Sequence, residues 1–347
     1  MALTFTLVEG WRHLLDLCQV REDESVVLLH GDASYPEHVA AAKLELARIG
    51  APTVMLQLGE SARRPKSGKL IALGPTALAG NKAAIAAMKA ADIVVDLFGM
   101  YRGAEQHEIQ AAGTRVILVK EPPETFLRLL PQYDDKRRVE AAKRCLENAR
   151  TMHITSKAGT DLRVELGEFP CLTQYGFTDQ PGRWDHCPST FVAIWPNELS
   201  ANGTVVLAPG TTILPFKSYV RTPVTLTIRD GFIRDIAGDF DAQYLRDYMA
   251  SFDDPEGYAV AHLGWGLNRN AHWTTLGLQD KFQTNGMDAR SFYGNFMFST
   301  GQNADIGGTR HTACHLDIPM QGCSITVDGQ AMVIDGDVVA DEQKVRA

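Results

Sequence analysis

The segment with the clearest chemical content lies near the carboxyl end, where His315 and Asp317 alternate with apolar residues. Successive side chains of an extended strand point to opposite faces. Cys314, Leu316 and Ile318 would then line one face, which suits a hydrophobic core. His315 and Asp317 would project together from the other face, as two ligands of a metal ion. A hydrogen-bonded His–Asp pair that only fixes the orientation of the ring would show the same short pattern.

A third ligand could come from His262, which lies in an apolar stretch punctuated by Gly264 and Gly266. Glycines beside a polar residue often mark the close approach of a backbone or a ligand. Two histidines and one carboxylate form the ligand set typical of non-haem Fe(II), which leaves positions open for substrate and oxygen. Taken alone, the pattern around His262 favours a histidine satisfied within the core.

A third segment, residues 181–189, gathers charged, aromatic and imidazole side chains between two prolines. It contains Arg183, Trp184, Asp185 and His186 and is predicted to be a loop, where binding residues concentrate. His186 can move protons at near-neutral pH. A solvated polar loop without a binding role is the alternative.

Composition limits the classes of protein that fit. The length of 347 residues predicts about two domains. Hydrophobic residues make up 45% and charged residues 22%, as in ordinary globular proteins. Lys and Arg total 34 against 42 Asp and Glu, a net charge of −8, so we expect no binding to nucleic acid or to an anionic membrane surface.

The sequence also predicts a cytoplasmic location. No stretch approaches the roughly 18 apolar residues that a membrane-spanning helix needs. The amino-terminal residues lack a basic region ahead of an apolar run, so we expect no secretory signal. The 6 cysteines are scattered without a CxxC pair, which is typical of reduced thiols in the cytosol.

The first 150 residues alternate short apolar runs with helical patterns. Near-continuous Val, Ile and Leu runs between amphipathic helices are typical of a parallel sheet covered on both faces, so we predict a doubly wound, Rossmann-like α/β domain over residues 1–150. No G-x-G-x-x-G or phosphate-loop motif follows any predicted strand, which argues against nucleotide binding. Predicted strands cover 25–30, 52–58, 69–73, 93–98 and 115–119, and predicted helices cover 36–49, 79–91, 104–112, 124–130 and 134–149.

Residues 151–347 are predicted to form a mixed α+β domain that is largely antiparallel and carries the metal site. Tight-turn signals at 157–160, 230–231 and 328–329 indicate hairpins. Predicted strands cover 152–154, 162–166, 204–207, 211–214, 224–228, 232–236, 323–327 and 331–334, and one helix covers 242–251.

Several segments resemble the bacterial 2,5-dihydroxypyridine 5,6-dioxygenases, and the resemblance extends over nearly the whole chain. It is denser in the second half. These enzymes are themselves similar in fold to the aminopeptidase T family of metallopeptidases. The segments that carry the resemblance are 134–138 (DDKRR), 156–159 (SKAG), 181–186 (PGRWDH), 242–249 (AQYLRDYM), 262–267 (HLGWGL), 288–294 (DARSFYG), 298–301 (FSTG) and 314–319 (CHLDIP).

The resemblance implies a mononuclear Fe(II) held by His262, His315 and Asp317. It also implies that O2 opens the ring of 2,5-dihydroxypyridine between C5 and C6, giving N-formylmaleamate in nicotinate and pyridine catabolism. His186 matches a pocket histidine that acts as acid or base, and Ser299 matches a pocket hydroxyl. The expected partners are thus a small aromatic N-heterocycle and O2, and we expect a homo-oligomer.

The predicted substrate pocket departs from the family pattern at two positions. This chain has Gln174 where the family carries a glutamate, and Arg102 where it carries a second histidine. Gln cannot ionise, and Arg is a permanent cation with fork-shaped donors. A related pyridine diol, with an extra carboxylate that pairs with Arg102, therefore remains open as the substrate. Arg183 is a further expected substrate-binding residue.

Two other classes of function compete with the dioxygenase. A metallopeptidase of the aminopeptidase T type would hydrolyse peptides through metal-bound water, but a pair of metals needs bridging carboxylates. The acidic residues nearest to His262 in the sequence are Asp253, Asp254 and Glu256. A non-catalytic binding protein is the third class, and the retention of all three proposed ligands argues against it.

Overall fold

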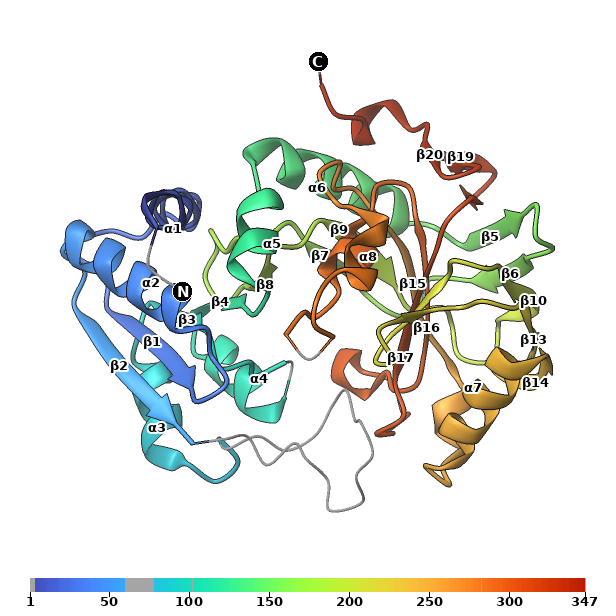
Figure 1. Cartoon of the computed structure of the whole chain (residues 1–347), viewed down its shortest axis with the longest axis horizontal. Coiled ribbons are helices and arrows are strands. Elements are labelled where there is room, and N and C mark those ends of the chain that lie inside the picture. Colours follow the sequence, from blue (N-terminus) through green and yellow to red (C-terminus); the bar gives the residue numbers. More distant parts are fainter. Residues whose placement is uncertain (1–3, 60–77, 102, 282, 347) are drawn as a thin grey trace. The chain divides into compact units, whose positions relative to one another are not determined.

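The chain forms two compact units in the computed structural model, which describes residues 4–59, 78–101, 103–281 and 283–346 (Figure 1). The first unit contains the described residues up to Tyr133, the segment Gln174–Ser189 and residues 283–285. The second contains Asp134–Thr173, Thr190–Lys281 and the described residues from Gly286 onwards. The boundary expected between residues 150 and 151 falls inside the second unit.

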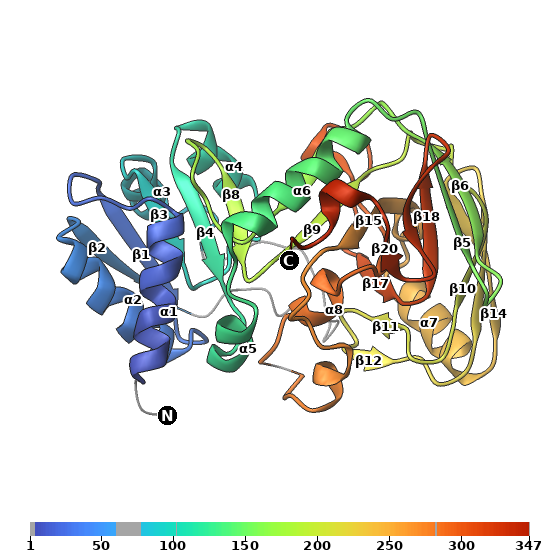
Figure 2. The same cartoon turned by 90° about the horizontal axis from the view of Figure 1, so that it is seen from above.

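The first unit is built on a parallel sheet whose described strands number five, in the order β2-β1-β3-β4-β8. β3 and β4 are buried along their whole length, because helices cover both faces. α1 packs against α2 and α5, whereas α3 packs against α4, and Figure 2 shows these two groups on opposite faces of the sheet. The elements are α1 (Phe5–Leu17), β1 (Val26–Gly31), α2 (Pro36–Ile49), β2 (Thr53–Leu58), α3 (Lys82–Lys89), β3 (Ile93–Asp96), α4 (Ala104–Ala111), β4 (Arg115–Val119), α5 (Pro123–Arg128) and β8 (Trp184–Cys187).

The parallel sheet and its alternating helices confirm the predicted class of the first unit. The strand expected at 69–73 lies outside the described residues. The prediction of a loop over 181–189 is wrong for Trp184–Cys187, because these residues form β8, which pairs with β4 in parallel. Leu118 pairs with His186 in this register, so the backbone of His186 is held in the sheet. A polar, proline-flanked segment carries no local signal for such a distant pairing.

The second unit is largely antiparallel, as predicted, and contains two larger sheets. Within the described ranges, one sheet has eight strands in the order β14-β13-β10-β6-β5-β18-β19-β20. Its members are β5 (Thr151–Ser156), β6 (Asp161–Glu165), β10 (Asn202–Leu207), β13 (Val224–Arg229), β14 (Phe232–Gly238), β18 (Cys323–Val327), β19 (Gln330–Ile334) and β20 (Asp337–Val338). The helix α7 (Phe240–Ala250) packs against β13 and β14.

The second sheet of this unit positions the candidate metal ligands, and its described strands run β17-β16-β15-β9-β7. β9, β15, β16 and β17 are buried over their full length, so they lack the alternating pattern that identifies a half-exposed strand. For this reason the sequence did not predict β9, β15 or β16, and it also missed β7, a strand of only four residues. The strands are β7 (Cys171–Gln174), β9 (Phe191–Ile194), β15 (Val260–Gly266), β16 (Phe296–Thr300) and β17 (Leu316–Met320).

The remaining elements of the second unit are short apart from one helix. They are α6 (Tyr133–Leu146), α8 (Met287–Ser291), the small hairpin of β11 (Thr212–Ile213) and β12 (Ser218–Tyr219), and 3₁₀ turns at Pro255–Tyr258, Trp273–Gly277, Ala304–Ile306 and Asp341–Gln343. Among the described residues, none of the helices combines the length and the apolar character needed to cross a bilayer.

Candidate metal centre

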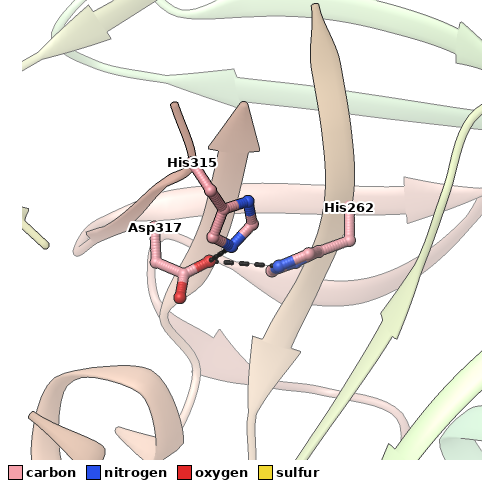
Figure 3. Close-up of side chains that lie close together, drawn as sticks. All are labelled: His262, His315 and Asp317. Atoms are coloured by element: carbon pink, nitrogen blue, oxygen red, sulfur yellow. Dashed lines mark ion pairs between the residues drawn. The ribbon is translucent and has the colours of Figure 1, made fainter. Parts of the chain in front are cut away.

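Three side chains of the second unit converge on one point (Figure 3). His262 comes from β15, Asp317 from β17, and His315 directly precedes β17. His262 Nε2 lies 3.0 Å from Asp317 Oδ1, and His315 Nε2 lies 3.4 Å from the same oxygen. The structure thus brings together the three residues that the sequence singled out as metal ligands.

The alternation of side chains along β17 explains how His315 and Asp317 meet. Leu316 and Ile318 are fully buried on one face of the strand, as is Cys314 just before it. His315 and Asp317 point to the other face, where their side chains approach each other. The predicted distribution of these five residues between core and site is therefore present in the fold.

An irregularity in β15 directs His262 towards the same point. The register between β15 and β16 shifts between Val260 and Leu263, so one extra residue is accommodated next to His262. Bulges of this kind re-aim a side chain and are frequent beside functional sites. Ser299 of β16 donates a hydrogen bond from Oγ to the carbonyl of His262, at 2.8 Å, and stabilises the irregular backbone. Ser299 also pairs with Asp317 in the strand register, so it links both sides of the site.

The distances from Asp317 to the two imidazoles fit a bound cation. Metal–nitrogen and metal–oxygen bonds are about 2.0–2.2 Å long, so neighbouring ligand atoms around one ion lie about 2.8–3.6 Å apart. The two distances from Asp317 Oδ1 fall in this range. Oδ1 is buried and accepts no regular hydrogen bond from the described residues. A lone His–Asp pair would involve one imidazole, whereas two imidazoles face this oxygen.

The guanidinium of Arg290, on the helix α8, contacts the other carboxylate oxygen of Asp317. Arg290 Nε and Nη2 both lie 2.8 Å from Asp317 Oδ2. Burial alone would raise the pKa of the Asp317 carboxyl, but Arg290, followed by His315 and His262, holds that pKa well below its usual range. Asp317 is therefore ionised at neutral pH and presents Oδ1 to the two imidazoles. Arg290 was missed by the sequence analysis, although the segment 288–294 contains it.

Aromatic and apolar groups surround the centre. The rings of Trp195 and His262 meet in a T-shaped arrangement at a centroid distance of 5.2 Å. His262 and Asp317 are each less than 10% exposed, at 9% and 7%. Electrostatic interactions are stronger in such a water-poor setting than at the surface. Trp195 carried no sequence signal, because a tryptophan that follows an apolar strand is ordinary core.

The expected proton carrier, His186, lies in the first unit, as do Gln174 and Arg183. Its ring is buried on β8, with the rings of Tyr101 and Trp184 at 6.3 and 6.5 Å. The Gln174 amide oxygen accepts a hydrogen bond from Ser189 Oγ at 2.7 Å. His186 is the third of the four residues of β8, near the carboxyl end of a parallel strand, and α/β sheets bind their ligands at such ends.

Arg183, an expected substrate-binding residue, is engaged within its own unit. Its guanidinium lies 2.6 Å from the fully buried Asp185 carboxylate and 3.7 Å above the centre of the Tyr175 ring. Asp185 also accepts hydrogen bonds from the backbone of Tyr175, Gly176 and His186. The observed contacts of Arg183 thus stabilise the strand that carries His186. Arg102, the other expected cation, lies outside the described residues.

Comparisons with known proteins agree on one family. The family model for 2,5-dihydroxypyridine 5,6-dioxygenase matches residues 6–340. A 2,5-dihydroxypyridine 5,6-dioxygenase of Pseudomonas putida KT2440 is 49% identical over 339 residues, which cover 97% of each chain. The solved structure of 2,5-dihydroxypyridine dioxygenase from Pseudomonas putida KT2440 has a TM-score of 0.94 at 48% identity, over 97% of this chain and 98% of that one.

A more distant likeness concerns the fold alone. Wild-type AmpT from Thermus thermophilus has a TM-score of 0.61 at 14% identity, over 98% of this chain and 100% of that chain. The resemblance in sequence to the dioxygenase family is thereby confirmed, together with the expected similarity of fold to aminopeptidase T.

We expect His262→Ala, His315→Ala and Asp317→Asn each to lose a bound divalent metal. Two remaining protein ligands would hold such an ion too weakly against its hydrated form. Metal content after anaerobic loading with Fe(II) and desalting measures the loss. His153→Ala is a matched control, because His153 on β5 also faces a carboxylate, Asp161 at 2.7 Å, away from the centre. Full metal content in one of the three variants would remove that residue from the ligand set.

Proposed function

The chain belongs to the 2,5-dihydroxypyridine 5,6-dioxygenase family, and from this premise we propose that it is an Fe(II)-dependent dioxygenase. It opens the ring of 2,5-dihydroxypyridine, or of a close pyridine-diol relative, between C5 and C6. Both atoms of O2 enter the product, which for 2,5-dihydroxypyridine is N-formylmaleamate, in the catabolism of nicotinate and other pyridines. The observation that supports the iron centre most directly is the convergence of His262 and His315 on Asp317.

The chemistry of the three ligands favours ferrous iron. Two imidazoles and one carboxylate are the set that non-haem Fe(II) oxygenases use, with further positions left for substrate and O2. Bound there, the metal would lower the pKa of a ring hydroxyl and hold the ring beside O2. Arg290 keeps Asp317 ionised and takes up Oδ2, so that Oδ1 is the oxygen available to a cation.

Proton transfer falls to His186 in this proposal. With a metal bound beside it, a ring hydroxyl would have to lose its proton, and an imidazole accepts protons near neutral pH. The Asp185 carboxylate accepts a hydrogen bond from the His186 backbone at 2.8 Å and holds this strand end in place. The rings of Tyr101 and Trp184 lie beside the imidazole.

The metallopeptidase alternative finds less support in the acidic residues near His262. Within the described part of the chain, His262, His315 and Asp317 form the only group of three side chains suited to a metal. Glu256 instead faces Arg310, at 3.8 Å. Asp254 accepts a hydrogen bond from the Glu256 backbone at 3.0 Å. These acids thus have structural partners, and a second metal has no evident bridging ligands among the described residues.

Metal analysis combined with oxygen uptake tests the proposed function. Protein reconstituted with Fe(II) under anaerobic conditions is mixed with a panel of dihydroxypyridines in aerated buffer. We expect one iron per chain and O2 consumed in step with the loss of ring absorbance. His315→Ala should show neither. Two zinc ions with peptide cleavage would indicate the metallopeptidase instead, and the absence of metal and of both activities would indicate a binding protein.

We expect His186→Ala to keep its iron and to lose most of the rate. A proton carrier contributes typically about 10²- to 10⁴-fold. The measurement is kcat across pH 6 to 9 together with iron content, and His153→Ala again serves as the control. Loss of iron in His186→Ala would assign this residue a structural or ligand role. A wild-type rate across the whole pH range would remove it from the mechanism.

Gln174 and Arg102 are proposed to set the choice of substrate. The amide oxygen of Gln174 is used by Ser189, so the side chain offers its nitrogen as a donor. A glutamate at this position would offer an acceptor or a shared proton. Arg102 brings a permanent positive charge with paired donors, which suits a carboxylate. Together the two residues favour a pyridine diol that carries an extra acidic group.

We therefore expect the double variant Gln174→Glu/Arg102→His to shift preference towards unsubstituted 2,5-dihydroxypyridine. The measurement is kcat/KM of both proteins on 2,5-dihydroxypyridine and on a carboxylated analogue. The wild type should favour the carboxylated ring by about tenfold or more, equivalent to about 1.4 kcal/mol. Equal ratios in both proteins would show that these two positions do not select the substrate.

A further inference from the structure

We propose that Asn295 is a positioning residue, which fixes Arg290 against Asp317 and thereby sets how Asp317 meets the metal. The inference rests on the metal centre proposed above. Asn295 lies directly before β16, the strand between those of His262 and Asp317, and its side chain is fully buried. It touches none of the three candidate ligands in the hydrogen bonds observed, so it would act through other residues.

The side-chain amide of Asn295 joins two elements. Its nitrogen donates to the carbonyl oxygens of Ala289 and Arg290, at 2.5 and 3.2 Å. Its oxygen accepts a hydrogen bond from the Gly266 backbone nitrogen at 2.6 Å. Ala289 and Arg290 belong to α8, and Gly266 is the last residue of β15, the strand that carries His262. One amide therefore fastens the helix of Arg290 to the strand of a metal ligand.

The helix α8 needs these hydrogen bonds because so short a helix has few hydrogen bonds of its own. The last carbonyls of a helix lack partners within the helix and must find them elsewhere. α8 has only five residues, and Asn295 supplies donors to two of these carbonyls. Without them, the backbone of Arg290 would depend on its remaining contacts alone.

The end of β15 is shaped to receive this helix. A Cβ on Gly266 would lie 2.4 Å from the Phe292 carbonyl oxygen and 2.5 Å from the Ser291 carbonyl carbon. The two backbones can approach so closely only because position 266 has no side chain. Gly266 also accepts a hydrogen bond from the Gly294 backbone at 2.9 Å. The hydrogen bonds of Asn295 thus stabilise a close contact between β15 and the end of α8 that the glycine at position 266 permits.

Asn295 would affect the metal site through the guanidinium of Arg290, which contacts the carboxylate of Asp317. Its Nε and Nη2 both contact Oδ2 of Asp317, which leaves Oδ1 towards His262 and His315. If Arg290 moves away, the carboxylate can rotate and offer both oxygens, or neither in the right place. Groups that orient a metal ligand typically contribute about 10- to 100-fold in metal affinity or activity. Asn295 would act at one further remove, by orienting Arg290.

Binding of Co(II), a redox-stable stand-in for Fe(II), tests the inference without any measurement of turnover. We expect Asn295→Ala and Arg290→Ala each to weaken Co(II) binding by roughly 10-fold or more and to change the visible spectrum of the bound ion. The double variant should bind as weakly as Arg290→Ala alone, within about twofold, because the two residues act in series. Affinity is measured by competition with a chelator.

Asn303→Ala is the matched control for the loss of a buried amide. Asn303 is buried, accepts a hydrogen bond from the Arg310 backbone and donates to Glu198 Oε1, and none of these residues belongs to α8. It should lower the free energy of unfolding much as Asn295→Ala does, while Co(II) binding stays at the wild-type level. If Asn295→Ala does not fold, Asn295→Asp carries the test, because it keeps the acceptor for Gly266 and loses the donors for α8.

Three results would overturn the inference. Wild-type Co(II) affinity in the Asn295 variants would show that the amide is merely structural. Wild-type Co(II) affinity in Arg290→Ala would show that Arg290 does not affect the metal site, so Asn295 could not act through it. Fully additive losses in the double variant would place Asn295 on a different route. A wild-type protein that binds neither Co(II) nor Fe(II) would instead overturn the proposed metal centre itself.

Discussion

The buried carboxylate of Asp317 is the constraint on which the centre of the second unit depends. A carboxylate without water is costly unless opposite charge and donors surround it. Asp317 meets this requirement with Arg290 on one oxygen and two imidazoles at the other. These groups come from three elements that are distant in the sequence, so the charge can be accommodated only when α8, β15 and β17 are all in place. A cation between the imidazoles and Oδ1 would complete the balance.

The sheet around Asp317 is adapted to bring these elements together. It is buried on both faces, and neighbouring backbones approach closely at positions without side chains. A Cβ on Gly264 would lie 1.9 Å from the Val192 carbonyl oxygen, so β9 and β15 can pack only with glycine there. The shift in register beside His262 and the hydrogen bond from Ser299 then direct one imidazole out of an otherwise apolar strand. Tight packing and one local irregularity together fix the ligand positions.

The first unit uses buried carboxylates for a similar purpose but pairs them with the backbone. Asp96, at the end of β3, accepts hydrogen bonds from the backbone nitrogens of Phe98, Gly99 and Met100. Asp185, in β8, is held by Arg183 and by three backbone nitrogens. Asp96 orders the turn that follows β3, and Asp185 orders the backbone around β8, the strand that carries His186. In both units, therefore, the expense of burying a charge is offset by interactions that order the residues around it.

The sequence alone determined the features that arise from local patterns. Alternating apolar runs and helices predicted the parallel sheet, and Asp-Gly turns predicted the hairpins at 230–231 and 328–329. The alternation around Asp317 placed His315 beside it, and motif resemblance identified the family. Tertiary structure decided what depends on distant segments meeting. β8 joined the first sheet, the chain divided at Tyr133 and Asp134 instead of residue 150, and Arg290 reached Asp317. The periodicity of apolar residues and the preferences of turn residues act over a few positions, so the elements that they define can be predicted from the sequence. The pairing of a strand edge or the neutralisation of a buried charge requires a partner that only the folded chain supplies.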